Sequence, residues 1–231
     1  MFSKEEVRGG RPIRCDQPDE KGTVTMKLTT TTFVSVDGVM QGISGRDEDR
    51  SGGFDRGGWT TPLWDNEART YVSEVYQHAD AFLFGRRTYE IFSGSWGAVA
   101  DPAINPIAKA LNTRPKYVAS TTLTDPGWAG TTALSGDVAA AVGELKAKPG
   151  GELQVHGSGA LIRWLLDNDL VDEMNLLTFP AVVGRGMRLF PDTGQDTALE
   201  LVESRATPNG VLIQVYRPAG RLQYGEERRP T

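Results

Sequence analysis

The stretch that decides the fold runs from residue 152 to residue 179 and reads ELQVHGSGALIRWLLDNDLVDEMNLLTF. Its first five residues are typical of a buried strand, and Gly157-Ser158-Gly159 then turn the chain into an apolar helix through Leu161 and Leu165. A second strand, Met174–Phe179, follows within a few residues. A strand, a helix and a strand joined by such short connections predict a parallel βαβ unit.

Strand and helix patterns alternate in the same way along the rest of the chain. The predicted strands are residues 27–36, 80–84, 116–120, 199–205 and 211–216, and the predicted helices are residues 65–79, a segment from Arg86, and 138–145. The last two strands flank Pro208-Asn209-Gly210, which is typical of a hairpin turn. We therefore expect an α/β domain with a largely parallel central sheet, flanking helices and an antiparallel C-terminal edge.

Three segments lack a strand or helix period. Residues 1–25 and 219–231 are polar and charged, so we predict a disordered leader and a disordered tail around a domain of residues 26–218. Residues 42–62 are rich in glycine and charge and form a long loop. Such a loop is rarely kept in a compact domain unless it has a role, such as covering a site.

Composition excludes several classes of function. The formal net charge of −5 argues against a nucleic-acid partner, which needs a surplus of Lys and Arg. Cys15 is the one cysteine, so no intrachain disulfide is possible, and with only His78 and His156 beside it we expect no metal site. No G-x-S-x-G elbow and no apolar run near the ~20 residues of a membrane span occur. We expect a cytoplasmic protein without a membrane partner.

Three turns at the carboxyl ends of predicted strands suit a phosphate. Gly85-Arg86-Arg87-Thr88 opens one helix and Gly157-Ser158-Gly159 opens another, while Ser120-Thr121-Thr122 follows a third strand. Each alone also fits an ordinary role: a capped helix with solvated arginines, a tight strand–helix connection, or plain turn residues. Because ligands of parallel sheets bind beyond the carboxyl ends of the strands, the three together favour an extended nucleotide.

Several motifs resemble a known family. Residues 85–90, GRRTYE, resemble the G-R-x-T-[WY]-E segment of dihydrofolate reductases. Residues 156–190 resemble the C-terminal reductase domain of bifunctional riboflavin deaminase–reductases and their stand-alone relatives, and Ser35-Val36-Asp37-Gly38 is similar to the S-[LV]-D-G that ends the family's first strand. Residues 59–61, WTT, loosely resemble a W-I-[ST] segment near the substrate. The resemblance covers about residues 26–217 and implies a dihydrofolate-reductase-like fold that binds NADPH.

The resemblance also implies roles for individual residues. Arg86, Arg87 and Thr88, which follow the turn at Gly85, would hold the cofactor's phosphates. Ser120 and Thr121 would lie near the adenosine 2′-phosphate. The pyrophosphate would be lined by Gly157, Ser158, Gly159, Ala160 and Leu161.

Asp37 is the candidate catalytic residue. In the family, the end of the first strand meets the nicotinamide and the substrate, where a carboxylate can orient a substrate N–H or relay a proton. The alternative is an Asp-Gly turn residue that stabilises its own backbone. The acidic residue that binds the pterin in dihydrofolate reductases has no assigned equivalent among Asp47, Glu48, Asp49, Asp55, Asp65 and Glu67.

The resulting hypothesis is an NADPH-dependent reductase of a pyrimidine or pterin-like heterocycle, most like 5-amino-6-(5-phosphoribosylamino)uracil reductase. The alternatives are dihydrofolate reductase-like activity and a non-catalytic NADPH-binding regulatory protein. Apolar Leu170, Val171 and Met174, together with relatives that form homodimers, lead us to expect a homodimer. His156 and Trp164 are expected in the core, and a capping or interface role is expected for Asp172 and Glu173.

Overall fold

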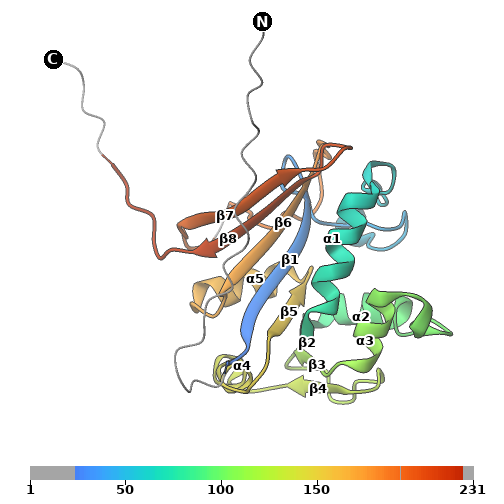
Figure 1. Cartoon of the computed structure of the whole chain (residues 1–231), viewed down its shortest axis with the longest axis vertical. Helices are drawn as coiled ribbons and strands as arrows, with labels where there is room; N and C mark the ends of the chain where they lie inside the picture. The colour runs from blue at the N-terminus through green and yellow to red at the C-terminus, as the bar shows by residue number, and fades with distance from the viewer. Residues whose placement is uncertain (1–23, 193, 226–231) are drawn as a thin grey trace, which may run out of the picture.

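Eight strands form one sheet in the order β4-β3-β2-β5-β1-β6-β8-β7 in the computed structural model, which describes residues 24–192 and 194–225 (Figure 1). The six strands from β4 to β6 are mutually parallel, β8 is antiparallel to β6, and β7 is antiparallel to β8. This arrangement confirms the predicted sheet and its antiparallel edge. The strands are β1 (Lys27–Ser35), β2 (Ala79–Gly85), β3 (Lys116–Ala119), β4 (Thr131–Leu134), β5 (Glu152–His156), β6 (Glu173–Phe179), β7 (Leu199–Ala206) and β8 (Leu212–Pro218).

Helices cover both faces of this sheet (Figure 1). They are α1 (Asn66–Gln77), α2 (Arg86–Ser95), α3 (Pro106–Thr113), α4 (Val138–Lys146) and α5 (Gly159–Asp167). Successive side chains of β2 point to opposite faces of the sheet. Leu83 therefore packs with α4 and α5 on one face, whereas Phe82 and Phe84 pack with α1, α2 and α3 on the other. Both cores are therefore built from the same strands.

The central position of β1 sets the place of the site. β1 pairs with β5 on one side and with β6 on the other, and Thr31 lies opposite both His156 and Asn175. β2 pairs in parallel with β5 on its far side. The carboxyl ends of β1, β2 and β5 consequently meet at one edge, and the chain leaves β2 and β5 there through the predicted glycine turns.

Two conspicuous polar residues have structural positions. His156 is 2% exposed and stacks on Tyr76 with 3.9 Å between ring centroids. Burial lowers the pKa of His156 to about 3, so it is a neutral core histidine at physiological pH, as expected. Asp172 accepts a hydrogen bond from the N–H of Leu28 (2.7 Å) and pairs with Lys146 (2.8 Å), which ties the start of β1 to α4.

Most of the predicted leader, residues 1–23, and the end of the predicted tail, residues 226–231, lie outside the described residues. Where described, both segments make backbone hydrogen bonds. Val24 accepts one from Gly150 (3.1 Å), and Ala219 donates one to Ala198 (2.7 Å). Within the described residues, backbone pairing therefore extends slightly beyond β1 and β8, the first and last strands in the chain.

Candidate functional site

A cavity of about 550 Å³ lies at the edge where β2 and β5 end, and we call it the edge cleft. It brings together two of the three predicted phosphate turns. Its lining includes Gly85, Arg86, Arg87, Thr88, Gly157, Ser158, Gly159, Ala160 and Leu161. Segments 40–43 and 186–188 also contribute to the wall, so four segments distant in sequence meet around one space.

The two helices that begin at the edge cleft lack a side-chain cap. The first turns of α1, α3 and α4 are capped by side-chain oxygens of Asp65, Asn105 and Asp137, each of which accepts a hydrogen bond from a backbone N–H. At α2 and α5 the capping positions, Gly85 and Ser158, make no such bond. The first N–H groups of a helix carry the positive end of its dipole, so both helices present donors suited to an anion.

Ser158 and Thr88 fasten these two helix ends to each other. The hydroxyl of Ser158 accepts a hydrogen bond from the N–H of Gly85 (3.0 Å), and the N–H of Ser158 donates to the hydroxyl of Thr88 (3.1 Å). The left-handed φ angles of Gly157 (58°) and Ser158 (52°) make this approach possible. Ser158 and Thr88 therefore position the helix ends, which explains why the serine does not cap its own helix.

Arg86 extends from α2 towards the turn that follows β3. Its Nε donates to Glu90 (2.8 Å), and its Nη1 donates to the hydroxyl of Thr122. Ser120 closes its own turn by accepting from the N–H groups of Thr122 (3.2 Å) and Leu123 (3.1 Å). Ser120, Thr121 and Thr122 all lie outside the edge cleft lining, and Thr122 is the residue of this turn whose hydroxyl accepts a hydrogen bond from Arg86.

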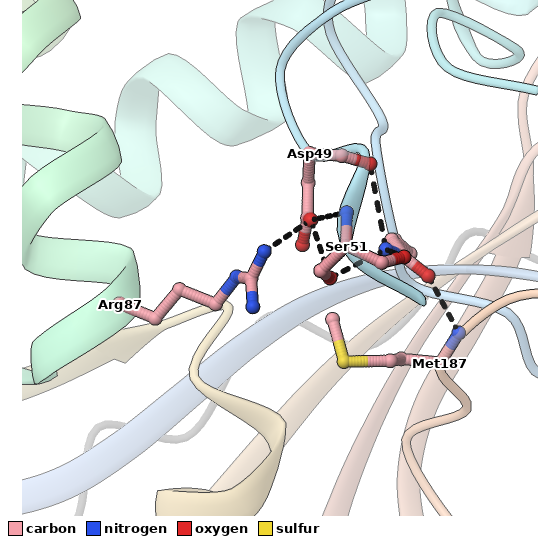
Figure 2. Close-up of polar contacts among 5 residues, drawn as sticks. Asp49, Ser51, Arg87 and Met187 are labelled. Carbon is pink, nitrogen blue, oxygen red and sulfur yellow. Dashed lines mark hydrogen bonds and ion pairs between the residues drawn. The ribbon is translucent and has the colours of Figure 1, made fainter. Parts of the chain in front are cut away.

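Arg87 points the other way and holds the glycine-rich loop (Figure 2). Its Nη2 donates to Asp49, whose side chain is only 6% exposed and also accepts from the N–H (3.0 Å) and hydroxyl (2.7 Å) of Ser51. Gln41 donates to the Ser51 carbonyl (3.0 Å) and accepts from the N–H of Met187 (3.0 Å). This network joins α2, loop 42–62 and the segment after β6 around the edge cleft.

Electrostatics favour the ionised form of Asp49 within this network. Burial raises the pKa of Asp49, but hydrogen bonds from Ser51 and the charge of Arg87 outweigh burial and hold the pKa below its usual value. Loop 42–62 is therefore tied to α2 by a charged contact in which the Asp49 carboxylate is buried and Arg87 is about half exposed. Arg87 also lines the edge cleft.

The carboxylate of Asp37 is occupied by the segment after β6. It accepts hydrogen bonds from the hydroxyl of Ser35 (2.7 Å) and from the N–H groups of Val183 (2.9 Å) and Gly184 (2.8 Å). The Ser35 bond chiefly lowers the pKa of Asp37, burial opposes it, and the two N–H groups add to it, giving a pKa of about 2. Asp37 does not line the edge cleft, and so low a pKa suits a hydrogen-bond acceptor better than a proton relay. The carboxylate thus anchors residues 183 and 184, which lie far from Asp37 in sequence, and a catalytic role for Asp37 stays a prediction.

A second, larger cavity of about 1050 Å³ adjoins the edge cleft, and we call it the aromatic cavity. It lies between α1, α2 and loop 42–62, and its walls include Phe33, Trp64, Tyr76, Phe92, Trp96 and Ile107. Ile43, Glu48, Ile91 and Phe92 line both cavities. Among the predicted substrate residues, only Thr61 of the WTT segment lines it. Sequence reasoning missed the other aromatic walls, since an apolar residue that lines a cavity has the same helical spacing as one in the core.

The family follows from a match over most of the chain. Residues 26–213 match the family model of the RibD C-terminal domain. The chain belongs to this family. The resemblance inferred from residues 85–90 and 156–190 is thereby confirmed.

Individual relatives agree with this assignment at the level of the fold. A putative riboflavin biosynthesis protein from Shewanella sp. PV-4 superposes with a TM-score of 0.65 at 22% identity, over 84% of this chain and 99% of that one. A pyrimidine reductase-like protein from Corynebacterium diphtheriae gives 0.55 at 15% identity, over 84% and 92%. The uncharacterized protein YyaP of Bacillus subtilis is 29% identical over 62% of this chain and 77% of its own length.

Within residues 24–192 and 194–225, no group of three or more His, Cys, Asp or Glu side chains is arranged to hold a metal ion. In the same residues, no helix combines the length and the apolar character that a bilayer crossing needs.

Proposed function

We propose that this chain is an NADPH-dependent reductase of a pyrimidine- or pterin-like heterocycle, with the cofactor in the edge cleft and the substrate in the aromatic cavity. Membership of the RibD C-terminal domain family supports a reductase. The observation that carries the proposal is the pair of helix N-termini, α2 and α5, that open into one cleft without side-chain caps.

The edge cleft fits the phosphates of a dinucleotide. A pyrophosphate has two charged groups, and α2 and α5 offer one uncapped helix end for each. The turn at Gly157 and Ser158 leaves room for close approach, because Gly157 carries no side chain and Ser158 is turned back towards Gly85. Arg86, exposed beside Thr122, is the cation we assign to the adenosine 2′-phosphate, which distinguishes NADPH from NADH.

The residues that line both cavities support one orientation of the bound cofactor. With phosphates at the helix ends, the nicotinamide extends towards Ile43, Ile91 and Phe92, where the edge cleft meets the aromatic cavity. When bound, the reduced nicotinamide supplies a hydride to the substrate. The residues of this chain hold the two molecules side by side and, through loop 42–62, limit the access of water.

The test has two stages. Calorimetric titration should give tighter binding of NADPH than of NADH, and absence of binding for both would refute the proposal. NADPH oxidation is then measured against heterocycles, beginning with the ribosylamino-pyrimidine phosphate of riboflavin synthesis and dihydrofolate. Tight NADPH binding without turnover of any heterocycle would instead favour a non-catalytic NADPH-binding protein.

A further inference from the structure

The charged residues that line the aromatic cavity are mostly acidic. They are Asp47, Glu48 and Glu90, against a single cation, Arg69. Arg69 is exposed, and its guanidinium lies over the ring of Trp64 at 5.5 Å from the centroid. Aromatic ring faces attract cations, and carboxylates repel phosphates, so the cavity has the electrostatic character of a site for a positively charged ring.

The aromatic cavity also lacks the phosphate-binding feature of the edge cleft. The one helix N-terminus among its lining residues is that of α3, and Asn105 occupies it. The side-chain oxygen of Asn105 accepts from the N–H groups of Ile107 (2.9 Å) and Ala108 (3.2 Å). The first N–H groups of α3, which could otherwise serve a phosphate, are therefore already satisfied by Asn105.

Glu48 differs from the other two carboxylates in its partners and in its position. Asp47 pairs with Arg50 (2.7 Å) and Glu90 pairs with Arg86 (2.8 Å), which reduces the charge that each presents. Glu48, half-buried, lines both cavities, and its Oε2 accepts a hydrogen bond from the backbone N–H of Ser44 (2.7 Å). A carboxylate thus lies where the aromatic cavity meets the edge cleft.

We propose that the substrate is a flat aromatic compound that carries a protonatable nitrogen and no phosphate, and that Glu48 determines this specificity by binding its N–H groups. This inference rests on the proposed function, because it takes the aromatic cavity as the substrate site. It separates this chain from an enzyme of phosphorylated pyrimidines while retaining NADPH-dependent reduction.

Three probes that share one ring test the charge preference in the full chain without cofactor: 2-naphthamidine, 2-naphthamide and 2-naphthyl phosphate. Calorimetry measures amidine binding, and the other two probes are then titrated against the bound amidine, so that each is compared in the same cavity. A charge-assisted bond predicts that the amidine binds at least about tenfold more tightly than the amide. Displacement of the amidine by the phosphate at an equal or lower concentration would overturn the inference, as would absence of amidine binding.

The variant Glu48→Gln tests the residue. Glutamine keeps a side-chain oxygen for the Ser44 N–H but has no charge, so the amidine preference should fall about tenfold with an unchanged melting temperature. Asp47→Asn is the matched control, an adjacent carboxylate confined to the aromatic cavity, and should stay within about twofold of the wild type. An undiminished preference in Glu48→Gln would refute the role of Glu48. NADPH is titrated separately, so failure of the cofactor to bind would refute the proposed function and leave the amidine preference standing.

Discussion

Replacement of Asp37 by Asn separates an anchoring role from a catalytic one. The two carboxylate oxygens accept three hydrogen bonds, from Ser35, Val183 and Gly184, and Oδ2 also lies 3.5 Å from Nη2 of the partly exposed Arg188. An asparagine has only one side-chain oxygen, so in either orientation its NH₂ group faces at least one backbone N–H. Losing a hydrogen bond to a charged group costs roughly 1.5–3 kcal/mol. With the Asp37 side chain 20% exposed, water compensates in part, and we expect a loss of about 2 kcal/mol.

Thermal unfolding measures this loss. For a domain of this size, about 2 kcal/mol corresponds to a fall in melting temperature of about 4–8 °C. The pH dependence provides a second measurement. The folded-state pKa of Asp37 is lowered from 3.8 to about 2, so its stabilisation is complete above pH 4 and is lost as the pH falls towards 2. The difference in stability between wild type and Asp37→Asn should therefore shrink over that interval.

Asp55→Asn provides the control for Asp37→Asn. Asp55 is a largely exposed carboxylate 4.0 Å from Arg185, and its replacement should change stability by less than about 0.5 kcal/mol. Anchoring predicts that the turnover of Asp37→Asn, measured well below its melting temperature, stays near that of the wild type. An unchanged melting temperature together with a 10²–10⁴-fold loss of kcat, the typical contribution of a general acid or base, would refute the anchoring role.

Three further substitutions test other parts of the molecule. Arg86→Ala should weaken NADPH binding by roughly 1–3 kcal/mol with little change for NADH, and an equal loss for both cofactors in calorimetry would contradict the 2′-phosphate assignment. Ser158→Ala leaves the N–H of Gly85 without its acceptor, so we expect a loss of about 1 kcal/mol in chemical unfolding and weaker NADPH binding; unchanged values for both would argue against its positioning role. Val171 and Met174, from which the homodimer was expected, are buried in the core of this chain, so the exposed edge strand β7 is the remaining candidate interface. Leu201, 51% exposed on β7, should give a monomer when replaced by Glu; light scattering that gives a monomer for the wild type would disprove the dimer.

The sequence predicted the parts of the fold in which apolar periodicity is strong. Strands β1, β2, β5 and β6 are buried and rich in apolar or β-branched residues, and their predicted positions agree with the structure to within one or two residues. One α-helix and one strand were missed, α3 and β4. β4 is a four-residue edge strand, TTAL, whose side chains are not fully buried, so no alternation marks it. α3 has only eight residues, PIAKALNT, too few for a clear helical period.

The sequence predicted the turns of the site, which depend on backbone geometry, but it did not predict the contacts between side chains from distant segments. Glycines at positions 85 and 157 marked the two turns, and both now line one cleft. The partner of Arg87, Asp49, is 38 residues away in a loop without secondary-structure signals, so no spacing rule pairs them. Asp37 likewise follows its strand as expected, but the N–H groups that occupy it belong to residues 183 and 184. Such contacts depend on the packing of loops, which local sequence does not specify.

The presence or absence of a side-chain cap at each helix N-terminus determines which of the two cavities can bind an anion. At α1, α3 and α4 an Asp or Asn satisfies the first N–H groups, and these helix ends have little left to offer an anion. At α5 the sequence also provides a capping residue, Ser158, but the left-handed turn directs its hydroxyl to Gly85 of the neighbouring junction. One serine thereby leaves its own helix uncapped and fixes the distance to α2, so that two positive helix ends face the same cleft. In the aromatic cavity beside it, the one helix N-terminus of the lining is capped and most charged lining residues are acidic, so a phosphate that enters both spaces should reside at the turns.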